Sequence, residues 1–485
     1  MLIVRRLLAS VLPLLLLLAW PSSLLAHGVL TRAEPAASAR LAVAPTVVRL
    51  TFSEAMEPAV SRIALIGPDG ANVALSPVRG GDSAAVLVAD ITGSLMVGSY
   101  TVVWQGAGRD GHPIHGQYQF TVAPAATGMP AVGPPRDRAS RVRRLRAQRL
   151  ARAAAIERNE DSFDSQSPIF SAIRCLQLVV ILALIGTVGF ALFVLPRAAR
   201  RGAPETFVID ADRSARSTGL TAAVMLLVVV AALRLLAQDV ALRGDEPFDA
   251  DALRAIIMGT MWGHAWLLQL VASLVACGGF LLIARARLAG WALVVLSTIA
   301  VVLATSLSGH AAAAPVQPGF AVFKDLVHLL AVGGWLGTLL LIAIAGMPAA
   351  LRLTPGGRSA TVATMVNVFS PFALICTTLV AISGVASAWA HLGQLGALWT
   401  TGYGRVLLIK LGVIVVLMAV GAFNWRVVRP SLGDEEGANR IERSATVELI
   451  VAALVIAVTS VLMATPTPSA AQTSGRDRAV QERVQ

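Results

Sequence analysis

Histidine is the residue of this chain whose type and placement point most directly to chemistry. The chain contains seven histidines, and imidazole is both a common ligand of transition metals and a proton carrier near neutral pH. Three lie in an N-terminal region of strand-like pattern, and four lie in or beside long apolar segments: His27, His112, His115, His264, His310, His328 and His391. We therefore expect two separate groups of candidate ligands.

The segment before His27 has the pattern of a secretory signal. Residues 1–26 carry Arg5 and Arg6, continue with an apolar centre and end in Ala26. This pattern predicts cleavage after Ala26 and export of the residues that follow. His27 would then be the first residue of the mature chain, with a free α-amine beside its imidazole.

Residues 27–123 are predicted to fold as a small all-β sandwich. Apolar and polar residues alternate in TVVRLTF, SRIALIG, SYTVVWQG and GQYQFTV, which indicates strands, and turn residues such as GPDG at 67–70 separate them. Such spacing is typical of a Greek-key sandwich of the cupredoxin or immunoglobulin type. Residues 124–167 are predicted to be a linker, whose Arg-rich part is either an amphipathic helix on anionic lipid or a solvated spacer.

The rest of the chain is too apolar for a soluble protein. Hydrophobic residues make up 56% of the sequence and charged residues only 14%. Helices of about 20 residues cross about 30 Å of hydrocarbon, and eight apolar segments reach that length: 169–195, 217–238, 256–283, 289–308, 320–347, 363–389, 404–425 and 445–464. Residues 168–465 are therefore predicted to form an all-α bundle of eight transmembrane helices, followed by a disordered tail over 466–485.

The distribution of charge predicts how the bundle is oriented. The formal net charge of +12 comes almost entirely from Arg, since Lys324 and Lys410 are the only lysines. If the sandwich is exported, most of the loop Arg is cytoplasmic, as the positive-inside rule requires. This pattern favours membrane topology over nucleic-acid binding. It also places every histidine on or near the outer face, with His264 and His328 roughly 12 Å into their helices.

The membrane histidines have two interpretations. A single one usually bonds to a neighbouring helix, but four at one depth favour a metal or cofactor site. Met261 and His264 share a helical face and form a thioether–imidazole pair suited to Cu(I), although methionine in a helix more often serves packing. Asp325, one turn before His328, would orient its imidazole or relay a proton. With His310 and His391, these residues are our candidates for a metal path.

Other residues of the apolar segments bear on packing and charge. Arg234 and Lys410 either line a polar path or pair with a neighbouring acid such as Asp239 or Asp325. Gly333 and Gly337 form a small-xxx-small pair that lets another helix approach closely. The three cysteines are far apart and lack a CxxC spacing, so no disulfide framework is indicated.

The first domain resembles the CopC copper-binding family. The resemblance rests on the HxxL…P opening and on a WxxxxxDGHPxxG element, formed here by Trp104, Asp110, Gly111, His112, Pro113 and Gly116. It implies a Cu(II) site with His27, Asp110 and His112 as ligands. An amino-terminal histidine offers its α-amine and Nδ1 in one chelate ring, a second imidazole completes an equatorial set, and a carboxylate oxygen adds a ligand. His115 is a candidate extra ligand.

The membrane region resembles the CopD copper-resistance family. The matching pieces are KDLVHLLAVGGWLGTL from residue 324, YGRVLLIKLGV at 403–413 and GAFNWR at 421–426. Their order after a CopC-like domain is similar to that of fused CopC–CopD proteins linked to copper import or tolerance.

Together these features predict a copper-binding membrane protein rather than an enzyme. It would capture Cu(II) outside the cytoplasmic membrane of a bacterium and transfer or import copper through its membrane histidines, without an ATP-binding loop. The expected partners are copper ions, membrane lipids and periplasmic copper chaperones, and no nucleic acid. Two alternatives are a haem-binding electron carrier or copper reductase, and sequestration of copper by an anchored sandwich.

Overall fold

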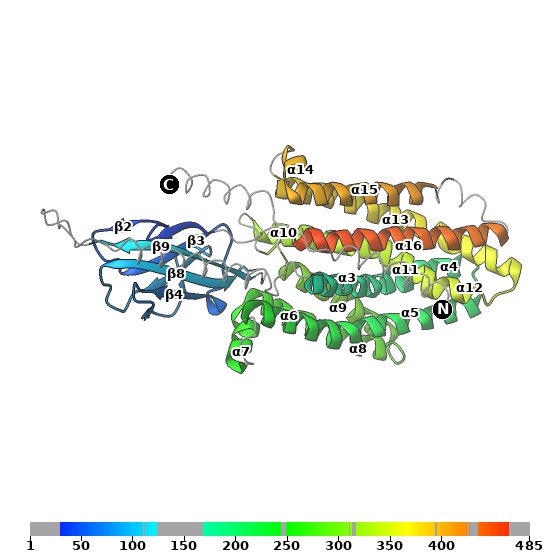
Figure 1. Cartoon of the computed structure of the whole chain (residues 1–485). Helices are drawn as coiled ribbons and strands as arrows, with labels where there is room; N and C mark the ends of the chain where they lie inside the picture. The colour runs from blue at the N-terminus through cyan, green and yellow to red at the C-terminus, as the bar shows by residue number, and fades with distance from the viewer. Residues whose placement is uncertain are drawn as a thin grey trace, which may run out of the picture.

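The computed structural model describes residues 30–109, 111, 113–123, 168–243, 249–309, 311–312, 317–392, 395–423, 426 and 435–464. Several predictions fall outside these residues: the signal segment, His27, Asp110, His112, the linker at 124–167, His310 and the tail. In the described part, a β-domain lies at one end of a long helical bundle (Figure 1).

The β-domain is a sandwich of two sheets. Their strand orders are β1–β3–β7–β6 and β2–β9–β8–β4–β5. The strands are β1 (Leu30–Glu34), β2 (Arg40–Leu41), β3 (Val47–Phe52), β4 (Arg62–Ile66), β5 (Asn72–Val73), β6 (Arg79–Gly80), β7 (Val86–Asp90), β8 (Gly98–Ala107) and β9 (Pro113–Val122). The short strand β2 joins β9 in parallel, and the other named pairs are antiparallel. The predicted all-β domain is confirmed.

The sandwich core forms because the alternating apolar residues of both sheets point inward. Phe52 of one sheet meets Trp104 of the other edge-to-face, with ring centroids 5.1 Å apart. Trp104 pairs across the β8–β9 hairpin with Gly116, where a Cβ would lie 2.5 Å from Cζ2 of the indole. Trp104 and Gly116, the first and last residues of the WxxxxxDGHPxxG element, therefore pack directly against each other.

The membrane region is all-helical. Its first helices are α3 (Pro168–Gly189), α4 (Leu195–Arg200), α5 (Glu205–Val224), α6 (Ala231–Arg243), α7 (Ala250–Gly259), α8 (Met261–Leu282) and α9 (Arg287–Leu307). They are followed by α10 (Pro318–Val332), α11 (Thr338–Leu341), α12 (Met347–Ala350), α13 (Pro355–Leu392), α14 (Ala397–Thr400), α15 (Gly402–Phe423) and α16 (Glu435–Ala464). Turns of π-helix join some of them: η2 (Phe190–Val194), η3 (Met225–Val230), η4 (Gly333–Gly337) and η5 (Ile342–Gly346).

Seven of the described helices are long and apolar enough to cross a membrane, by length and composition. They begin at Ile169, Glu205, Met261, Arg287, Pro318, Gly356 and Gly402. The eighth predicted segment corresponds to a shorter apolar stretch, Thr446–Leu462, within α16. The prediction of a multi-pass helical bundle is confirmed, with seven candidate spans among the described residues against the eight predicted.

One predicted helix boundary was wrong. The third apolar segment was expected to run unbroken over 256–283, but α7 ends at Gly259 and α8 begins at Met261. Thr260 adopts an extended conformation between them and accepts a hydrogen bond from the N–H of Gly263 at 2.9 Å. It is therefore an N-cap, which starts a new helix. His264 consequently lies in the first turn of α8.

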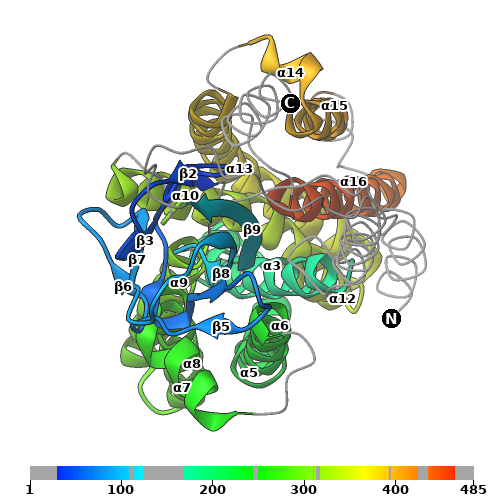
Figure 2. The same cartoon turned by 60° about the vertical axis from the view of Figure 1, so that its left-hand side comes forward.

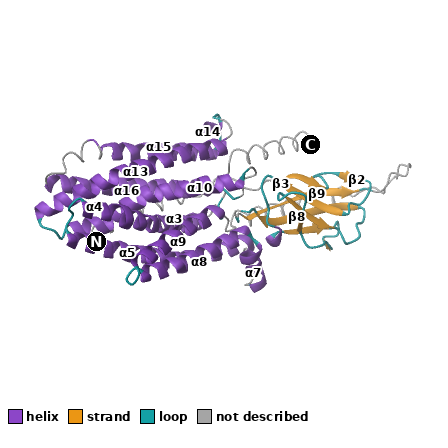
Figure 3. Ribbon diagram, turned by 180° about the vertical axis from the view of Figure 1, so that it is seen from behind, coloured by secondary structure: helices purple, strands orange, loops and turns teal. Residues whose placement is uncertain are grey.

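Two groups of helices lie on opposite sides of the bundle. Figures 1 and 2 show α13 and α15 on one side and α5 and α8 on the other, and Figure 3 shows the same arrangement from behind.

The glycine pair of η4 lies against α3. A Cβ on Gly337 would collide with the Leu182 carbonyl of α3. The predicted close approach at this glycine pair is confirmed.

Candidate functional site

The β8–β9 hairpin ends in a tight turn that carries the candidate ligand loop. Gly111 has a φ of +83°, which favours glycine, and its N–H donates to the Gly108 carbonyl at 2.8 Å. A second backbone hydrogen bond fixes the turn to the loop before β4: the N–H of Arg109 donates to the Ala55 carbonyl at 2.9 Å. Asp110 and His112 flank Gly111 in the sequence and lie outside the described residues.

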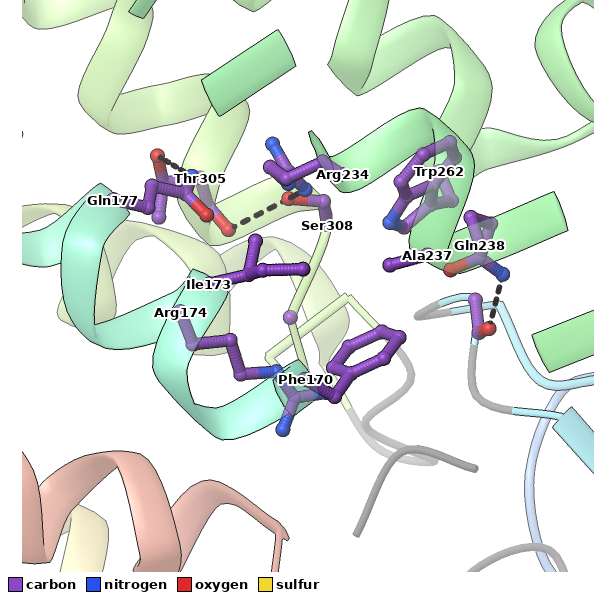
Figure 4. A pocket seen from close by; sticks show the side chains of 12 residues that line it. Phe170, Ile173, Arg174, Gln177, Arg234, Ala237, Gln238, Trp262, Thr305 and Ser308 are labelled. Atoms are coloured by element: carbon purple, nitrogen blue, oxygen red, sulfur yellow. Dashed lines mark hydrogen bonds between the residues drawn. The ribbon is translucent and has the colours of Figure 1, made fainter. Parts of the chain in front are cut away.

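Gly111 rests directly on the membrane helices. The side-chain amide of Gln238, on α6, donates to the Gly111 carbonyl at 2.5 Å (Figure 4). A Cβ on Gly111 would lie 2.6 Å from Cδ1 of Trp262, on α8. Both features of glycine, its positive φ and its missing side chain, are therefore required here. The turn between the candidate Cu(II) ligands is a contact point between the two domains.

Two further hydrogen bonds join the sandwich to the helices. Gln105 of β8 donates to the Leu242 carbonyl at the end of α6, at 2.5 Å. The Glu57 carboxylate accepts the backbone N–H of Met261, the first residue of α8, at 2.9 Å.

Apolar packing completes this contact. Ala107 of the sandwich belongs to one buried cluster with Ala231, Leu242, Ile256, Trp262 and Trp266 of the helices. Hydrogen bonds and burial together hold the sandwich docked on α6, α7 and α8.

A cavity of about 60 Å³ lies beneath Gly111. We call it the interface cavity, and its lining includes Gly111, Arg174, Gln177, Arg234, Trp262 and Ser308. Arg234 is almost fully buried and donates to Gln269 Oε1 at 2.5 Å and to Ser308 Oγ at 2.8 Å. Its guanidinium also lies 5.3 Å from the ring centroid of Trp262. Figure 4 shows these side chains converging from different helices.

The sequence offers Asp239 as a partner of Arg234, but the structure gives both residues other contacts. Arg243 forms an ion pair with Asp239 at 2.6 Å, one turn along the same helix. Arg234 therefore belongs to the interface cavity, where its hydrogen-bond partners are neutral.

His264 lies beside the docking contact. Its side chain is exposed, and its charge acts on Glu57. Burial raises the pKa of the Glu57 carboxyl, while the Met261 N–H and the charges of Arg109 and His264 act in the opposite direction. Met261, the predicted thioether partner of His264, is partly buried in the same turn. This region combines a carboxylate, an imidazole and a thioether at the boundary of the two domains.

His328 has a different environment. Its Nδ1 lies 2.9 Å from Ser383 Oγ, on α13. Lys324 and Lys410 act on it electrostatically, and Asp325 acts on both lysines. The predicted partnership of Lys410 with Asp325 thus appears as an electrostatic interaction between α15 and α10. A polar cluster of Lys324, Asp325, His328, Ser383 and Lys410 joins α10, α13 and α15.

The structure does not bring His264 and His328 into one cluster. Helix α9 packs against both α8 and α10, and the two histidines have the separate neighbours given above. Among the described residues, no group of three or more His, Cys, Asp and Glu is arranged to hold a metal ion. His391 lies near the end of α13, and His115 is exposed on β9 opposite Gln105.

Three contact residues were missed from the sequence: Glu57, Gln238 and Trp262. Glu57 is an acid in a loop, and nothing in its local pattern shows that it meets a residue 204 positions away. The position of Gln238 in an apolar segment was the one sequence feature that could have indicated a contact, because a polar side chain in lipid needs a hydrogen-bond partner.

Family models match most of the described chain. The CopC domain matches residues 30–123. The N-terminal domain of copper resistance protein D-like proteins matches residues 164–320, and copper resistance protein D matches residues 363–462.

Individual relatives agree with these matches. The chain is 23% identical over 464 residues to copper transport protein CutJ of Bacillus subtilis (strain 168), covering 94% of this chain and 77% of that protein. It is 37% identical over 101 residues to protein YobA of Escherichia coli (strain K12), covering 21% of this chain and 82% of YobA. The crystal structure of CopC from Methylosinus trichosporium OB3b matches 21% of this chain and all of that chain, with 35% identity and a TM-score of 0.20.

Proposed function

Since this chain belongs to the fused CopC–CopD copper resistance family, we propose that its sandwich captures Cu(II) outside the membrane and passes copper directly into the helical domain. The observation that carries the proposal is the position of Gly111. This residue lies between Asp110 and His112 in sequence, contacts Trp262 and Gln238, and lines the interface cavity. A capture loop held against the membrane helices needs no separate carrier to deliver its copper.

In this proposal the Cu(II) ligands are His27, Asp110 and His112. The α-amine and Nδ1 of His27 form a chelate ring, His112 adds a second imidazole, and Asp110 adds an oxygen. His115 is a lesser candidate, because Ile114 points into the core and His115 points to the opposite face of the sheet, beside Gln105.

The first acceptor in the helical domain is His264, with Met261. These residues lie in the turn of α8 that binds Glu57 of the sandwich, so a ligand exchange there needs only local movement. Imidazole and thioether together suit copper in either oxidation state.

The second copper-binding residue of the proposed path is His328, on α10. Asp325 counters the positive charges of Lys324 and Lys410 beside it, and Ser383 orients the imidazole. His310, which lies outside the described residues, and His391 are the remaining candidates for the proposed path. Helix α9 packs against both α8 and α10, and we propose that copper binds His264 first and His328 second rather than both at once.

The test uses the full chain in proteoliposomes loaded with a copper-sensitive dye. Trp262→Ala removes the surface on which Gly111 rests, and we expect it to slow copper movement at least tenfold while Cu(II) still binds the sandwich. The matched control is Trp389→Ala, because Trp389 is 65% exposed on α13, away from the docking contact.

Two measurements make the result decisive. Equilibrium Cu(II) binding reports the capture site, and dye fluorescence reports movement. If Trp262→Ala and Trp389→Ala move copper at the same rate with Cu(II) binding intact, direct delivery through the docked loop is wrong.

A further inference from the structure

A groove opens between α3 and α5 on the surface of the bundle. Its volume is about 300 Å³, at the lower end of the range for small-molecule pockets. Both helices belong to candidate membrane spans, and Val179 on the groove wall is 41% exposed, so the groove faces lipid rather than water. One wall is formed by Val179, Val180 and Ala183 of α3, and the other includes Ser217 and Thr221 of α5 and Met225 of η3.

The two faces of α5 have different environments. On one face, a Cβ added at Gly219 would clash with the ring of Phe280 of α8, so this face is packed inside the bundle. On the other face, Arg213, Ser217 and Thr221 follow one another at intervals of four residues, and all three are exposed. Residues four apart lie on the same side of a helix. These three residues therefore form one outward stripe, and the last two of them line the groove.

The charge pattern of α5 places this stripe at the edge of the hydrocarbon. Charged residues occur in α5 as far as Arg216, and none occurs from 217 to 233. A charged side chain is costly in the membrane interior and is tolerated at its interface. Arg213 therefore lies at the level of the lipid head groups, Ser217 lies at the start of the apolar region, and Thr221 lies one turn deeper. This edge is at the end of the bundle away from the sandwich (Figure 1).

Two hydroxyls of the stripe are available to a lipid. Thr218 Oγ1 donates to the Ser214 carbonyl at 3.0 Å, as hydroxyls in helices commonly do, whereas the Ser217 and Thr221 hydroxyls form no such bond with a described residue. A polar group in lipid needs a hydrogen-bond partner. The ester carbonyl oxygens of a phospholipid lie below its head group and accept hydrogen bonds, so the two hydroxyls are suited to donate to them.

Arg213 is suited to bind the phosphate of the same lipid. The nearby acids of α5 pair with other arginines, since Asp210 lies 2.9 Å from Arg352 and Asp212 lies 3.0 Å from Arg216. In the described part of the chain, Arg213 forms no ion pair. Helical side chains lean toward the N-terminus of their helix, which for α5 is the end outside the apolar region. The guanidinium therefore extends toward the phosphate level.

We propose that this groove binds one anionic phospholipid. Its phosphate lies at Arg213, its ester carbonyls accept hydrogen bonds from Ser217 and Thr221, and one acyl chain follows the groove toward Met225. Such a lipid differs from the surrounding lipids because its head group and its chain are both held by the protein. The site involves α3 and α5 and requires no copper, so its tests are independent of the proposed function.

The first experiment compares head groups on the full chain in an uncharged detergent. Added phosphatidylglycerol should raise the unfolding temperature saturably, because a ligand of the folded state stabilises it. Phosphatidylcholine with the same acyl chains should give a smaller rise, and glycerol phosphate, which has no acyl chain, should give none. Equal rises with the two lipids, or a full rise with glycerol phosphate, would overturn the proposal.

Arg213→Gln should weaken the binding of phosphatidylglycerol about fivefold, the factor that one arginine contributes near an anionic lipid surface. Native mass spectrometry of the full chain measures the retained lipid. Arg285→Gln is the matched control. Arg285 is exposed and lies at the same end of the bundle, because Arg287, two positions later, is 3.7 Å from Asp212. Losses of equal size in the two variants would mean a general attraction of anions to this end and would exclude the site.

Filling the groove should displace the acyl chain. Val179→Trp places an indole on the α3 wall and should lower the retention of phosphatidylglycerol, whereas Val271→Trp, at a position of α8 that is 54% exposed and outside the groove, should not. If Val179→Trp does not fold, Thr221→Val replaces it, because valine keeps the side-chain shape and removes the hydroxyl. Equal retention by the groove variant and the control contradicts the proposal.

Photo-crosslinking locates the acyl chain directly. Phosphatidylglycerol with a diazirine in one acyl chain should label residues 179–183 and 217–225 of the full chain, as mapped by mass spectrometry of peptides. Excess phosphatidylglycerol without the diazirine should suppress this labelling, and excess phosphatidylcholine should not. Labelling confined to other segments would show that the lipid does not bind in this groove.

Discussion

The carboxylate of Glu57, in the sandwich, accepts a hydrogen bond from the backbone N–H of Met261, the first residue of α8, at 2.9 Å. An acceptor at this position satisfies a helix N–H that has no partner within the helix, and its negative charge is favourable at the positive end of the helix dipole. The sandwich therefore takes part in capping a membrane helix, and the cap lies one turn from His264.

Glu57→Ala should weaken the docking of the sandwich. The variant leaves the Met261 N–H without its acceptor, which costs about 1–2 kcal/mol, and Glu57→Gln should retain most of the stability because it keeps an acceptor oxygen. Protease protection of the linker and thermal unfolding of the purified chain measure the effect. Glu34→Ala is the control, since Glu34 forms an exposed ion pair with Arg32. Equal stability of the two alanine variants would show that the cap does not hold the domains together.

Gly116→Ala should destabilise the sandwich by overpacking. Its Cβ would lie 2.5 Å from Trp104, and the indole is held by Phe52, so the cost should be about 1–3 kcal/mol. Gly80→Ala is the matched control, because its Cβ would meet only Pro58 Cγ at 3.7 Å. Chemical denaturation followed by tryptophan fluorescence compares them. A smaller loss for Gly116→Ala than for Gly80→Ala would contradict the assigned contact.

The position of His27 at the start of the mature chain can be tested by extension. One residue added before His27 converts its α-amine into an amide and so destroys the chelate ring that the amine forms with Nδ1, and the Cu(II) affinity of the full chain should fall about tenfold or more. Mass spectrometry of the unmodified protein checks that cleavage follows Ala26, and competition with a chromophoric chelator measures the affinity. An unchanged affinity would remove the amino terminus from the ligand set.

His112→Ala should weaken Cu(II) binding far more than His115→Ala. His112 belongs to the family element, whereas His115 is exposed on β9 opposite Gln105. The same competition assay on the full chain compares the two variants, which are matched in residue type and differ by three positions. Equal losses would mean that the ligands are assigned wrongly.

His264→Ala and His328→Ala should each stop copper movement and leave Cu(II) capture intact. In the proposed path copper binds the two residues one after the other, so either substitution blocks the path and the double variant should be no slower than either single variant. Dye-loaded proteoliposomes measure the rate. Normal movement by the double variant would exclude these histidines from the path.

Local patterns in the sequence were enough to predict both architectures. Strand alternation depends on neighbouring residues, and it located the sandwich that the structure confirms. Length and apolarity located the spans, because each helix must satisfy its own backbone in lipid. The family element WxxxxxDGHPxxG was also visible, although its packing reason, the contact of Trp104 with Gly116, appears only when β8 and β9 are paired.

The contacts between the domains depended on tertiary structure alone. Counting residues along a helix gives the depth of a side chain but not the neighbouring helix or the direction in which the side chain points. Counting residues places His264 and His328 at one depth, whereas the N-cap at Thr260 puts His264 in the first turn of α8 and His328 lies well inside α10. Gly111 and Trp262 are distant in sequence, and so are Arg234 and Ser308. Only the packed chain brings them together, because their contact depends on how whole elements dock.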